Sequence, residues 1–467
     1  MEYDLEQGLI FIMLKAFFDL HPDLRIIIDH SYGPGVYCRY SDEDRRIDLI
    51  AVRKRMREIM DAKAKIEILR LNRSQFRRRF SHRDDLLGLL QSKKRVYTCY
   101  RLGNYLDHMI SPLSIQFDKI SDFEIESYPP GFVLSWGEFV SRPRLFRMIQ
   151  EYEEWGQILG VYDVGRLNKA IVERFEQLIL LAEALHEKKI AYIADRIIKE
   201  RKRLILVAGP SASGKTTFSK RLAIQLLASG ISPVAISIDD FFLPRDQTPY
   251  GPDGCRDFEC LEALNIELLS RDLQLLLSGE PVNLPKFNFH TGRPEYRKRV
   301  ERLSEKDVLI LEGIHGLNDQ LTYTIDPEVK FKIYASAITQ LNIDDHNRIH
   351  TRDTRLIRRM VRDVQFRDHP ATETIGLWTN VVKGEDKYIF PFQEEADVMF
   401  NSALIYELPV LAYFARRLLK RIKRSDPSYD EAQRLYDLLS YFCSVRAEPV
   451  PDNSILREFI GGSIYDY

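Results

Sequence analysis

The sequence lacks paired cysteines and long apolar runs. Its five cysteines form no CxxC motif and are odd in number, which argues against a disulfide framework and fits reduced thiols; they are Cys38, Cys99, Cys255, Cys260 and Cys443. No apolar stretch approaches the roughly 20 residues that cross a bilayer. The first six residues carry acids where a secretory signal carries bases. These absences predict a cytoplasmic protein without a membrane partner.

An excess of charge of one sign is missing as well. The chain has 68 Lys and Arg against 69 Asp and Glu, a formal net charge of −1. No global field draws it to nucleic acid, which is therefore not an expected partner. Basic residues do gather between residues 45 and 79, but acids are interspersed and apolar residues recur at helical spacing. We expect the solvated faces of amphipathic helices there rather than an RNA-binding surface.

The 467 residues are too many for a single core, and the sequence texture divides them into four parts. Residues 1–144 mix helical patterns with short β-type runs and predict an α+β domain. Residues 145–200 are helical almost throughout and predict a helical connector. Residues 201–411 alternate apolar runs with helical segments and predict an α/β domain with a parallel sheet. Residues 412–467 predict a mainly helical C-terminal extension.

Four apolar runs in the third part are short and continuous, as in strands buried on both faces of a parallel sheet. They are Leu204–Ala208, Pro233–Ile238, Val308–Leu311 and Phe331–Tyr334. The carboxyl ends of such strands meet at one edge of the sheet. We therefore expect Asp239, Asp240 and Glu312, which follow two of these runs, to lie at the same edge as the loop after the first.

That loop, residues 209–216, has the sequence GPSASGKT and fits the phosphate-binding pattern GxxxxGK[ST] between a strand and a helix. Its glycines let backbone N–H groups turn toward phosphates, and the helix N-terminus adds positive charge. Lys215 is expected to reach the β- and γ-phosphates and Thr216 to ligate Mg²⁺. The loop predicts a site for ATP and Mg²⁺, with nucleotide contacts from Gly209, Ser211, Ser213, Gly214, Lys215, Thr216 and Thr217.

Two carboxylates and a group of arginines complete the predicted site. A metal held by one hydroxyl needs a nearby carboxylate. The candidates are Asp239 and Asp240 after one strand and Glu312 after another, and a carboxylate there can also take a proton from an attacking hydroxyl. Four arginines recur at i, i+3, i+4 and i+7 on one helix face: Arg355, Arg358, Arg359 and Arg362. Like charges repel, so we expect an anion opposite them, and the phosphates of ATP are the first candidate. Pairing with acids such as Asp353 and Asp363 is the alternative.

Residues 203–410 resemble the uridine kinase/phosphoribulokinase group of P-loop kinases. Five segments carry the likeness in the family's order: the loop at 209–216, Ser237–Phe242, Pro285–Phe289, Leu311–Ile314 and Arg355–Asp363. The resemblance implies phosphorylation of a nucleoside 5′-hydroxyl, with Asp239 as the base that takes its proton. A different small alcohol or a sugar is the alternative acceptor.

The resemblance also assigns roles to individual residues. It implies that the catalytic residues are Asp239, Lys215, Arg358 and Arg362. It implies that Arg355 and Arg359 bind the nucleotide, and that all four arginines belong to a mobile lid. It implies Thr216 and Glu312 as metal ligands. It implies a substrate site formed by Asp239, Phe242, Phe258, Glu259 and Phe287. Glu259 stands in place of an Asp, Phe242 and Phe287 in place of tyrosines, and Gly292 where a base-reading His is common.

The first part has a resemblance of its own. Residues 100–113 look like the YRxGDxxDxCxGPH stretch of the threonyl-tRNA synthetase editing domain, and residues 30–37 also suit that domain. Met109 and Leu113 replace the Cys and the last His. The resemblance therefore implies a module without hydrolase activity, kept for structure, regulation or binding.

Other classes of function stay open beside the kinase. A nucleotide-switched RNA-binding regulator would also use residues 209–216. A GTPase is disfavoured because the sequence has no NKxD segment, and an aminoacyl-ester hydrolase is disfavoured by Met109 and Leu113. We also expect a homo-oligomer.

Overall fold

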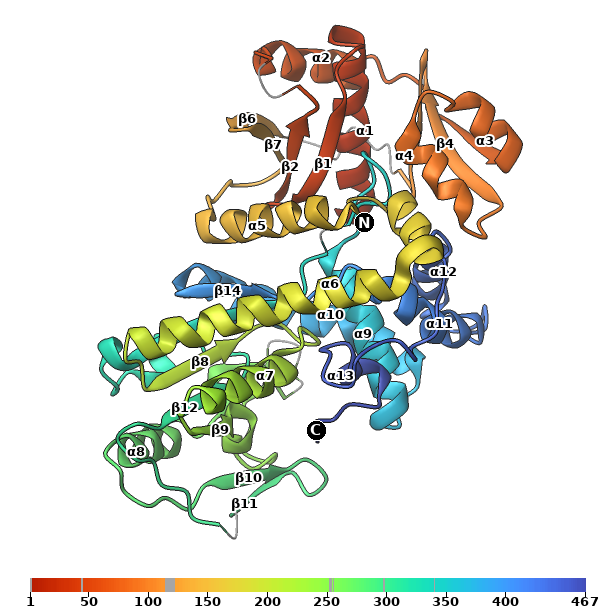
Figure 1. Cartoon of the computed structure of the whole chain (residues 1–467). Coiled ribbons are helices and arrows are strands. Elements are labelled where there is room, and N and C mark those ends of the chain that lie inside the picture. The colour runs from red at the N-terminus through yellow and green to blue at the C-terminus, as the bar shows by residue number, and fades with distance from the viewer. Residues whose placement is uncertain are drawn as a thin grey trace.

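The structure, a computed structural model, describes residues 2–42, 45–113, 122–251, 254, 256–296, 299–339 and 341–467. An N-terminal part with antiparallel sheets lies at one end, and a part built on a parallel sheet lies at the other (Figure 1). Two long helices run between them. Cys255 lies outside the described residues, and the other four cysteines are free thiols.

In its described residues, the N-terminal part combines two antiparallel sheets with four α-helices. One sheet has the strand order β1-β2-β7-β6 and the other β3-β4-β5. The helices are α1 (Glu2–Leu20), α2 (Leu49–Asp61), α3 (Arg73–Arg79) and α4 (Asp84–Gly88). The strands are β1 (Ile26–Ser31), β2 (Gly35–Tyr40), β3 (Glu67–Asn72), β4 (Val96–Leu102), β5 (Tyr105–His108), β6 (Glu124–Tyr128) and β7 (Gly131–Ser135). Helix α1 is buried along most of its length and forms the centre of one apolar cluster.

The charged segment between residues 45 and 79 is not helical throughout, contrary to the expectation from its spacing. Helices α2 and α3 do form, but the residues between them make β3, which pairs antiparallel with β4. All six residues of β3, Glu-Ile-Leu-Arg-Leu-Asn, are exposed or half-buried. Pairing with a neighbouring strand decides the conformation here, because β-propensity depends on cross-strand partners more than on the segment itself.

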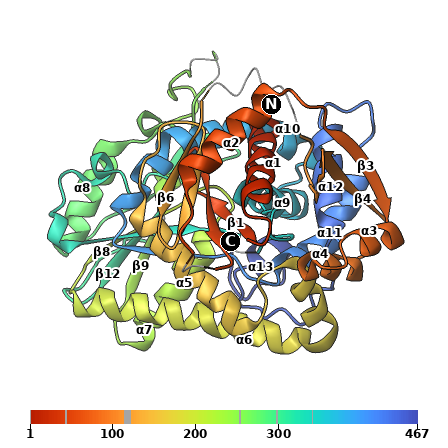
Figure 2. The ribbon, with the colours of Figure 1, turned by 90° about the horizontal axis from the view of Figure 1, so that it is seen from above.

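Two helices connect the parts, α5 (Pro143–Leu159) and α6 (Val164–Lys199). Asp163 caps α6 by accepting a 2.7 Å hydrogen bond from the N–H of Arg166, and the non-helical backbone of Arg174 kinks the helix. Figure 2 shows α6 beside α7 (Lys215–Ala228) along one side of the parallel sheet. Helix α6 is therefore part of the core of the C-terminal half, in which Ile190 and Ile193 are fully buried.

The C-terminal half is built on five parallel strands in the order β14-β13-β8-β12-β9. They are β8 (Leu204–Ala208), β9 (Pro233–Ser237), β12 (Val308–Glu312), β13 (Lys330–Ser336) and β14 (Val398–Asn401). The expected α/β class with a parallel sheet is confirmed, and the four apolar runs form four of the strands. The sequence reasoning missed β14, which has only four residues.

Alternation along the central strands divides the core of this half into two layers. Leu204 and Leu206 face the cluster that contains α8 (Ile266–Leu277). Ile205 and Val207 face the cluster that contains α6 and α7. Every residue of β8 is buried, because the strand lies in the middle of the sheet with helices on both faces.

The remaining elements surround the carboxyl edge of this sheet. A hairpin is formed by β10 (Pro285–Asn288) and β11 (Arg293–Tyr296). The helices are α9 (Thr351–Phe366), α10 (Ala371–Tyr388), α11 (Glu407–Lys420), α12 (Tyr429–Leu439) and α13 (Arg457–Ile460). No helix in the described residues has the length and apolar character of a membrane span.

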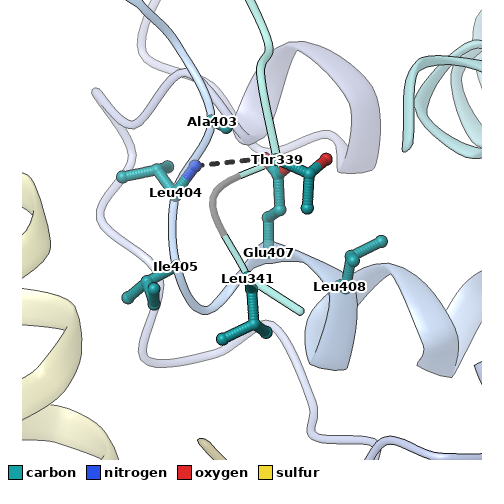
Figure 3. Close-up of a pocket in the computed structure, with 7 residues that line it drawn as sticks. All are labelled: Thr339, Leu341, Ala403, Leu404, Ile405, Glu407 and Leu408. Carbon is teal, nitrogen blue, oxygen red and sulfur yellow. Dashed lines mark hydrogen bonds between the residues drawn. The ribbon is translucent and has the colours of Figure 1, made fainter. Parts of the chain in front are cut away.

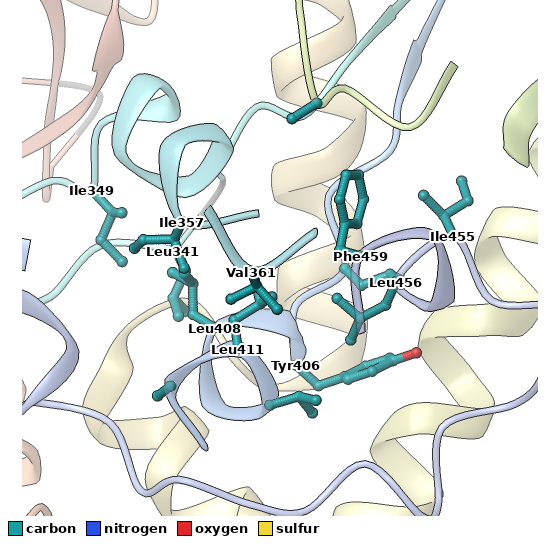
Figure 4. Close-up of a cluster of buried hydrophobic side chains, with 14 of the residues drawn as sticks. Leu341, Ile349, Ile357, Val361, Tyr406, Leu408, Leu411, Ile455, Leu456 and Phe459 are labelled. Atoms are coloured by element: carbon teal, nitrogen blue, oxygen red, sulfur yellow. The ribbon is translucent and has the colours of Figure 1, made fainter. Parts of the chain in front are cut away.

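Residues 455–460, near the end of the chain, are part of this core. Helix α11 crosses the expected boundary at residue 411, and Ile455, Leu456 and Phe459 are fully buried. Figure 4 shows these side chains packed with Val361 of α9 and with residues of α11. The division into four parts stays a prediction. The apolar cluster described here includes residues on both sides of the predicted boundary between residues 411 and 412.

The two halves are joined by buried polar contacts. His108 at the end of β5 bonds Asp344 through Nδ1 (2.8 Å) and the Tyr441 hydroxyl through Nε2 (2.9 Å). The side-chain amide of Asn347 donates to the carbonyl of His108 (2.9 Å). His108, Asp344 and Asn347 are each at most 1% exposed. Buried polar groups with complete partners fix one arrangement, so the N-terminal part has a defined place on the C-terminal half.

Candidate active site

Residues 209–216 form a tight loop between β8 and α7, and two of its glycines are required by the geometry. A Cβ on Gly209 would lie 1.8 Å from the carbonyl oxygen of Ala335 on β13, so the strand leaves no room for a side chain. Gly214 has a φ of +77°, in the left-handed region that glycine adopts without strain. The loop brings Lys215 to its inner side, where Nζ donates to the carbonyl of Pro210 (3.3 Å).

The first carboxylate of the site is Glu312, at the end of β12. The hydroxyl of Thr216 donates a 3.0 Å hydrogen bond to Glu312 Oε2. The contact follows from the topology, because β12 pairs directly with β8 and their ends meet at one edge. Burial raises the pKa of Glu312 to about 7; Lys215 lowers this pKa and Asp239 raises it.

The second carboxylate, Asp239, lies in the turn Ile238–Phe241 that follows β9. The Ser237 hydroxyl accepts the N–H of Asp239 (3.3 Å) and starts this turn. Burial raises the pKa of Asp239, Lys215 lowers it, and Asp240 raises it. The adjacent Asp240 accepts the N–H of Phe287 (3.3 Å) and so ties the β10–β11 hairpin to the site. The sheet thus brings Asp239, Glu312 and Lys215 to one place, as the strand pattern predicts.

The oxygen groups at this edge suit Mg²⁺ in a site completed by phosphates. Mg²⁺ prefers oxygen ligands and binds through one or two carboxylates together with the phosphates of a nucleotide. Thr216 and Glu312 supply a hydroxyl and a carboxylate in contact with each other. Among the described residues no group of three or more His, Cys, Asp or Glu forms a metal site of its own. A metal held by Thr216 and Glu312 would take its further ligands from the phosphates of a nucleotide and from water.

The residues assigned to the acceptor lie beside these carboxylates. Burial, together with the nearby carboxylate of Glu385, raises the pKa of Glu259 to about 7. The Cβ that Gly384 lacks would lie 3.1 Å from the side chain of Glu259, so the glycine lets the two segments pack closely. The rings of Phe242 and Phe287 meet edge to face with centroids 5.6 Å apart.

Two further details of the acceptor side were not visible in the sequence. Phe258 is 40% exposed, whereas the neighbouring Glu259 is half-buried. Gly292 has the side chain of Arg245 against it, 3.0 Å from the position of a Cβ, and Arg245 donates to the carbonyl of Phe289 (2.8 Å). The sequence reasoning did not single out Arg245, because its contact with the hairpin is a product of the fold.

The arginine stripe on α9 does not face an open space as a whole. Arg355 and Arg358 are both fully buried. Arg355 makes a two-pronged ion pair with Glu385 on α10 and lies near the carbonyl of Ser211 (3.4 Å). Arg358 pairs with Glu407 on α11. Acids of the protein balance the charge of these two side chains, as in the alternative that the sequence left open, so their charge alone does not require a nucleotide. Their predicted roles in catalysis and nucleotide binding stay predictions.

Both buried arginines also brace the phosphate loop. Arg358 donates to the carbonyl of Ala212 (3.3 Å) and to that of Ser402 after β14 (3.0 Å). Glu407 also accepts the N–H of Leu404 (3.3 Å), and Figure 3 shows this bond at the edge of a small pocket. That pocket has a volume of only about 10 Å³, which is room for no more than a water molecule. The hydrogen bonds from Arg355 and Arg358 to loop carbonyls stabilise the conformation of the phosphate loop.

The other two arginines of the stripe lie closer to solvent. Arg359 donates to the Ser211 hydroxyl (3.2 Å), and Arg362 lies 3.7 Å from Glu458. Both also contact Asp363, one of the acids considered from the sequence. The other, Asp353, pairs instead with Arg434 on α12. Direct contact of the stripe with a nucleotide stays a prediction.

Three carboxylates at the site were missed by sequence reasoning: Glu385, Glu407 and Glu458. Glu385 accepts the N–H of Ser211 (3.1 Å) in addition to its pair with Arg355. Each of the three follows the arginine stripe by many residues and has no motif around it. The one signal in the sequence was the row of arginines on one helix face, because charges that become buried require partners.

Comparison with known proteins agrees with this geometry. The model of the phosphoribulokinase/uridine kinase family matches residues 204–405. A uridine kinase of Halalkalibacterium halodurans is 30% identical over 203 residues, 43% of this chain and 86% of the relative. One of Anoxybacillus flavithermus is 28% identical over 205 residues, 43% of this chain and 87% of the relative.

A solved structure described as a possible uridine kinase from Bacillus stearothermophilus is 20% identical. The match covers 46% of this chain and 98% of the chain in that structure, with a TM-score of 0.32. The strand–loop–helix at residues 204–228, the contact of Thr216 with Glu312 and the matches to the two uridine kinases lead to one assignment. The chain belongs to the phosphoribulokinase/uridine kinase family of P-loop kinases.

Proposed function

We propose that the protein transfers the γ-phosphoryl group of ATP to a hydroxyl of a small molecule, with the 5′-hydroxyl of a nucleoside as the first candidate. The observation that carries the proposal is the meeting of Asp239, Glu312 and Lys215 beside the phosphate loop. Phosphoryl transfer needs a cradle for the donor, a metal site and a group that takes the acceptor's proton. These three residues, with Thr216, meet those needs.

In this proposal the loop and Lys215 hold the β- and γ-phosphates of the donor. Mg²⁺, bound by Thr216 and Glu312, would neutralise charge on the phosphate oxygens. The acceptor oxygen forms a bond to the γ-phosphorus as the bond to the β,γ-bridging oxygen breaks. Asp239 takes the proton of the attacking hydroxyl, and ADP leaves. A pKa of Asp239 raised by burial favours this role, since a stronger base accepts the proton more readily.

The acceptor side supports a polyol with an apolar face. Glu259 lies in electrostatic contact with Asp239 and Lys215, where a carboxylate can accept hydrogen bonds from ribose hydroxyls. The rings of Phe242 and Phe287 offer faces for a base. The two phenylalanines in place of tyrosines leave fewer hydrogen bonds for that base, so another sugar or alcohol is the second candidate acceptor.

For the N-terminal part we propose a module similar to the threonyl-tRNA synthetase editing domain but without hydrolase activity. Met109 is fully buried in the apolar cluster around α1, and Leu113 packs against the same cluster. Neither supplies the polar group that ester hydrolysis requires. The role of this part is structural or regulatory in the proposal, and residues 201–411 carry the transferase site.

The test is a panel of nucleosides and sugars offered to the full chain with ATP and Mg²⁺, with ADP release as the readout. Asp239→Asn should lose at least about a thousandfold of turnover, in the range of a lost general base, while ATP binding stays within about threefold. No turnover with any acceptor would reject the kinase. Full function of Asp239→Asn in ATP-dependent RNA binding would favour a nucleotide-switched regulator instead.

A further inference from the structure

The C-terminal segment of the chain reaches the first turn of α7, next to the phosphate loop, and accepts hydrogen bonds from Thr217 there. Thr217, the residue after GPSASGKT, donates its hydroxyl to Glu458 Oε2 (2.6 Å), and its backbone N–H lies 3.3 Å from the same oxygen. The hydroxyl of Tyr467 lies 2.8 Å from the Thr217 hydroxyl. Thr217 is fully buried. The donors of this residue are therefore taken by the tail in the structure.

These donors are groups that a phosphate would use. The backbone N–H groups of a GxxxxGK[ST] loop and of the first turn of its helix cradle the α- and β-phosphates. Arg362 lies 3.7 Å from the other oxygen of the same carboxylate. Glu458 thus lies between a helix N-terminus and a guanidinium, a place that attracts a phosphate group for the same reasons.

The tail is anchored firmly enough to hold the carboxylate there. Leu456 and Phe459 on either side of Glu458 are fully buried, and the ring of Phe459 lies against the guanidinium of Arg358 at 4.9 Å. Ile455 lies 2.6 Å from the position of a Cβ on Gly214. A fixed backbone presents the Glu458 side chain to Thr217, so only the side chain needs to move to release it.

We propose that Glu458 sets the affinity of the donor site: its carboxylate stands where a nucleotide phosphate binds, and ATP must displace it. This inference rests on the proposed use of ATP at this loop. Two negative groups cannot share the Thr217 donors, and a carboxylate next to a phosphate repels it at short range. Displacement of Glu458 also releases Arg362 from this carboxylate. Arg362 can then contact the phosphates when the nucleotide enters, as predicted for the arginines of α9.

The test measures nucleotide affinity rather than turnover. Calorimetric titration of the full chain with the β,γ-imido analogue of ATP and Mg²⁺ is compared between wild type, Glu458→Gln and Glu448→Gln. Glu448 is exposed in the same C-terminal segment and controls for the change of net charge. Glu458→Gln should bind the analogue at least tenfold more tightly, and Glu448→Gln should match wild type within twofold.

A purely structural role for Glu458 predicts the opposite pattern. A carboxylate that only caps α7 would stabilise the helix, and its loss would lower the melting temperature without tightening binding. If wild type binds the analogue and Glu458→Gln binds it equally or more weakly, this inference is overturned and the proposed function is unaffected. Failure of wild type and Glu458→Gln alike to bind the analogue overturns both.

If Glu458→Gln does not yield folded protein, Glu458→Asp replaces it. The shorter side chain keeps the charge but withdraws the carboxylate from the Thr217 hydroxyl, which lies 2.6 Å from it in the wild type, and the buried Leu456 and Phe459 still hold the backbone. The inference then predicts about threefold tighter binding of the analogue than in wild type. Binding that is unchanged or weaker in Glu458→Asp overturns it.

Discussion

The hydroxyl of Thr216 and the carboxylate of Glu312 are in direct contact although 96 positions separate them in the chain. Two neighbouring parallel strands, β8 and β12, end at this point and bring the two side chains together. Together the two side chains offer a hydroxyl and a carboxylate to a metal ion. This pair is therefore the place to test whether the metal and the donor use the same edge of the sheet.

Glu312→Gln should impair magnesium use more than nucleotide binding. The amide keeps the size of the side chain and a hydrogen-bond acceptor for Thr216 but loses the negative charge that attracts Mg²⁺. We expect kcat to fall at least about a hundredfold, or ~3 kcal/mol in the barrier, with the Mg²⁺ concentration for half-maximal rate raised. Steady-state rates over a Mg²⁺ series provide the measurement. A variant with the wild-type Mg²⁺ dependence would exclude Glu312 as a ligand.

The same carboxylate makes the ligand-free protein sensitive to pH. The pKa values of Glu312 and Glu259 are raised by burial to about 7 in the folded chain from 4.5. Between pH 4.5 and 7 the folded state therefore holds protons that the unfolded chain has released, and stability falls as pH rises through this window. The contribution is on the order of 1–3 kcal/mol for each group.

Glu312→Gln removes one of these two contributions. Its melting temperature without ligands should exceed that of wild type by an amount that grows from pH 5 to pH 7.5. Differential scanning calorimetry at four pH values measures this difference. A constant difference across the range would contradict the assignment of the titration to Glu312.

Loss of the acid partner of Arg358 should destabilise the whole chain. Glu407→Ala leaves a buried guanidinium without its carboxylate, which costs about 3–5 kcal/mol. Asp386→Ala is a matched control, because Asp386 and Arg352 form an ion pair whose side chains are 53% and 48% exposed, and such pairs contribute about 0–1 kcal/mol. Equilibrium unfolding in urea gives both values. Equal and small effects would show that Arg358 finds another partner.

Glu259→Gln should change recognition of the acceptor and leave the donor unaffected. A hydrogen bond to a charged group contributes about 1.5–3 kcal/mol, so the KM for the acceptor should rise about 10- to 100-fold. The KM for ATP should stay within about twofold, since ATP is held by the phosphate loop. Initial rates with each substrate varied in turn separate the two effects. A rise in the KM for ATP alone would move Glu259 to the donor side.

The parts of the fold that were predictable from the sequence are those that local pattern determines. The runs that became β8, β9, β12 and β13 are strands because each is short, apolar and bounded by turn residues. The parallel arrangement then places Asp239 and Glu312 at the loop. The helix α9 and its arginine spacing were also visible in the sequence.

The partners of the arginines could not be read in the same way. Arg358 and Glu407 are 49 positions apart, and Thr217 and Glu458 are 241 apart. Such pairs depend on how elements pack rather than on spacing along one element. The same reason explains β3, whose strand conformation is decided by its pairing with β4 and not by its own charged sequence.

The polar contacts of His108 have a consequence for how the protein can be divided. Phe76 and Tyr97 of the first half share one continuous apolar cluster with α6 and with Leu435 of α12. A recombinant fragment of residues 201–411 would expose the faces that α6 and α12 cover and would leave Asp344 without its histidine. Such a fragment should aggregate when expressed alone, whereas the intact chain should melt in a single cooperative step.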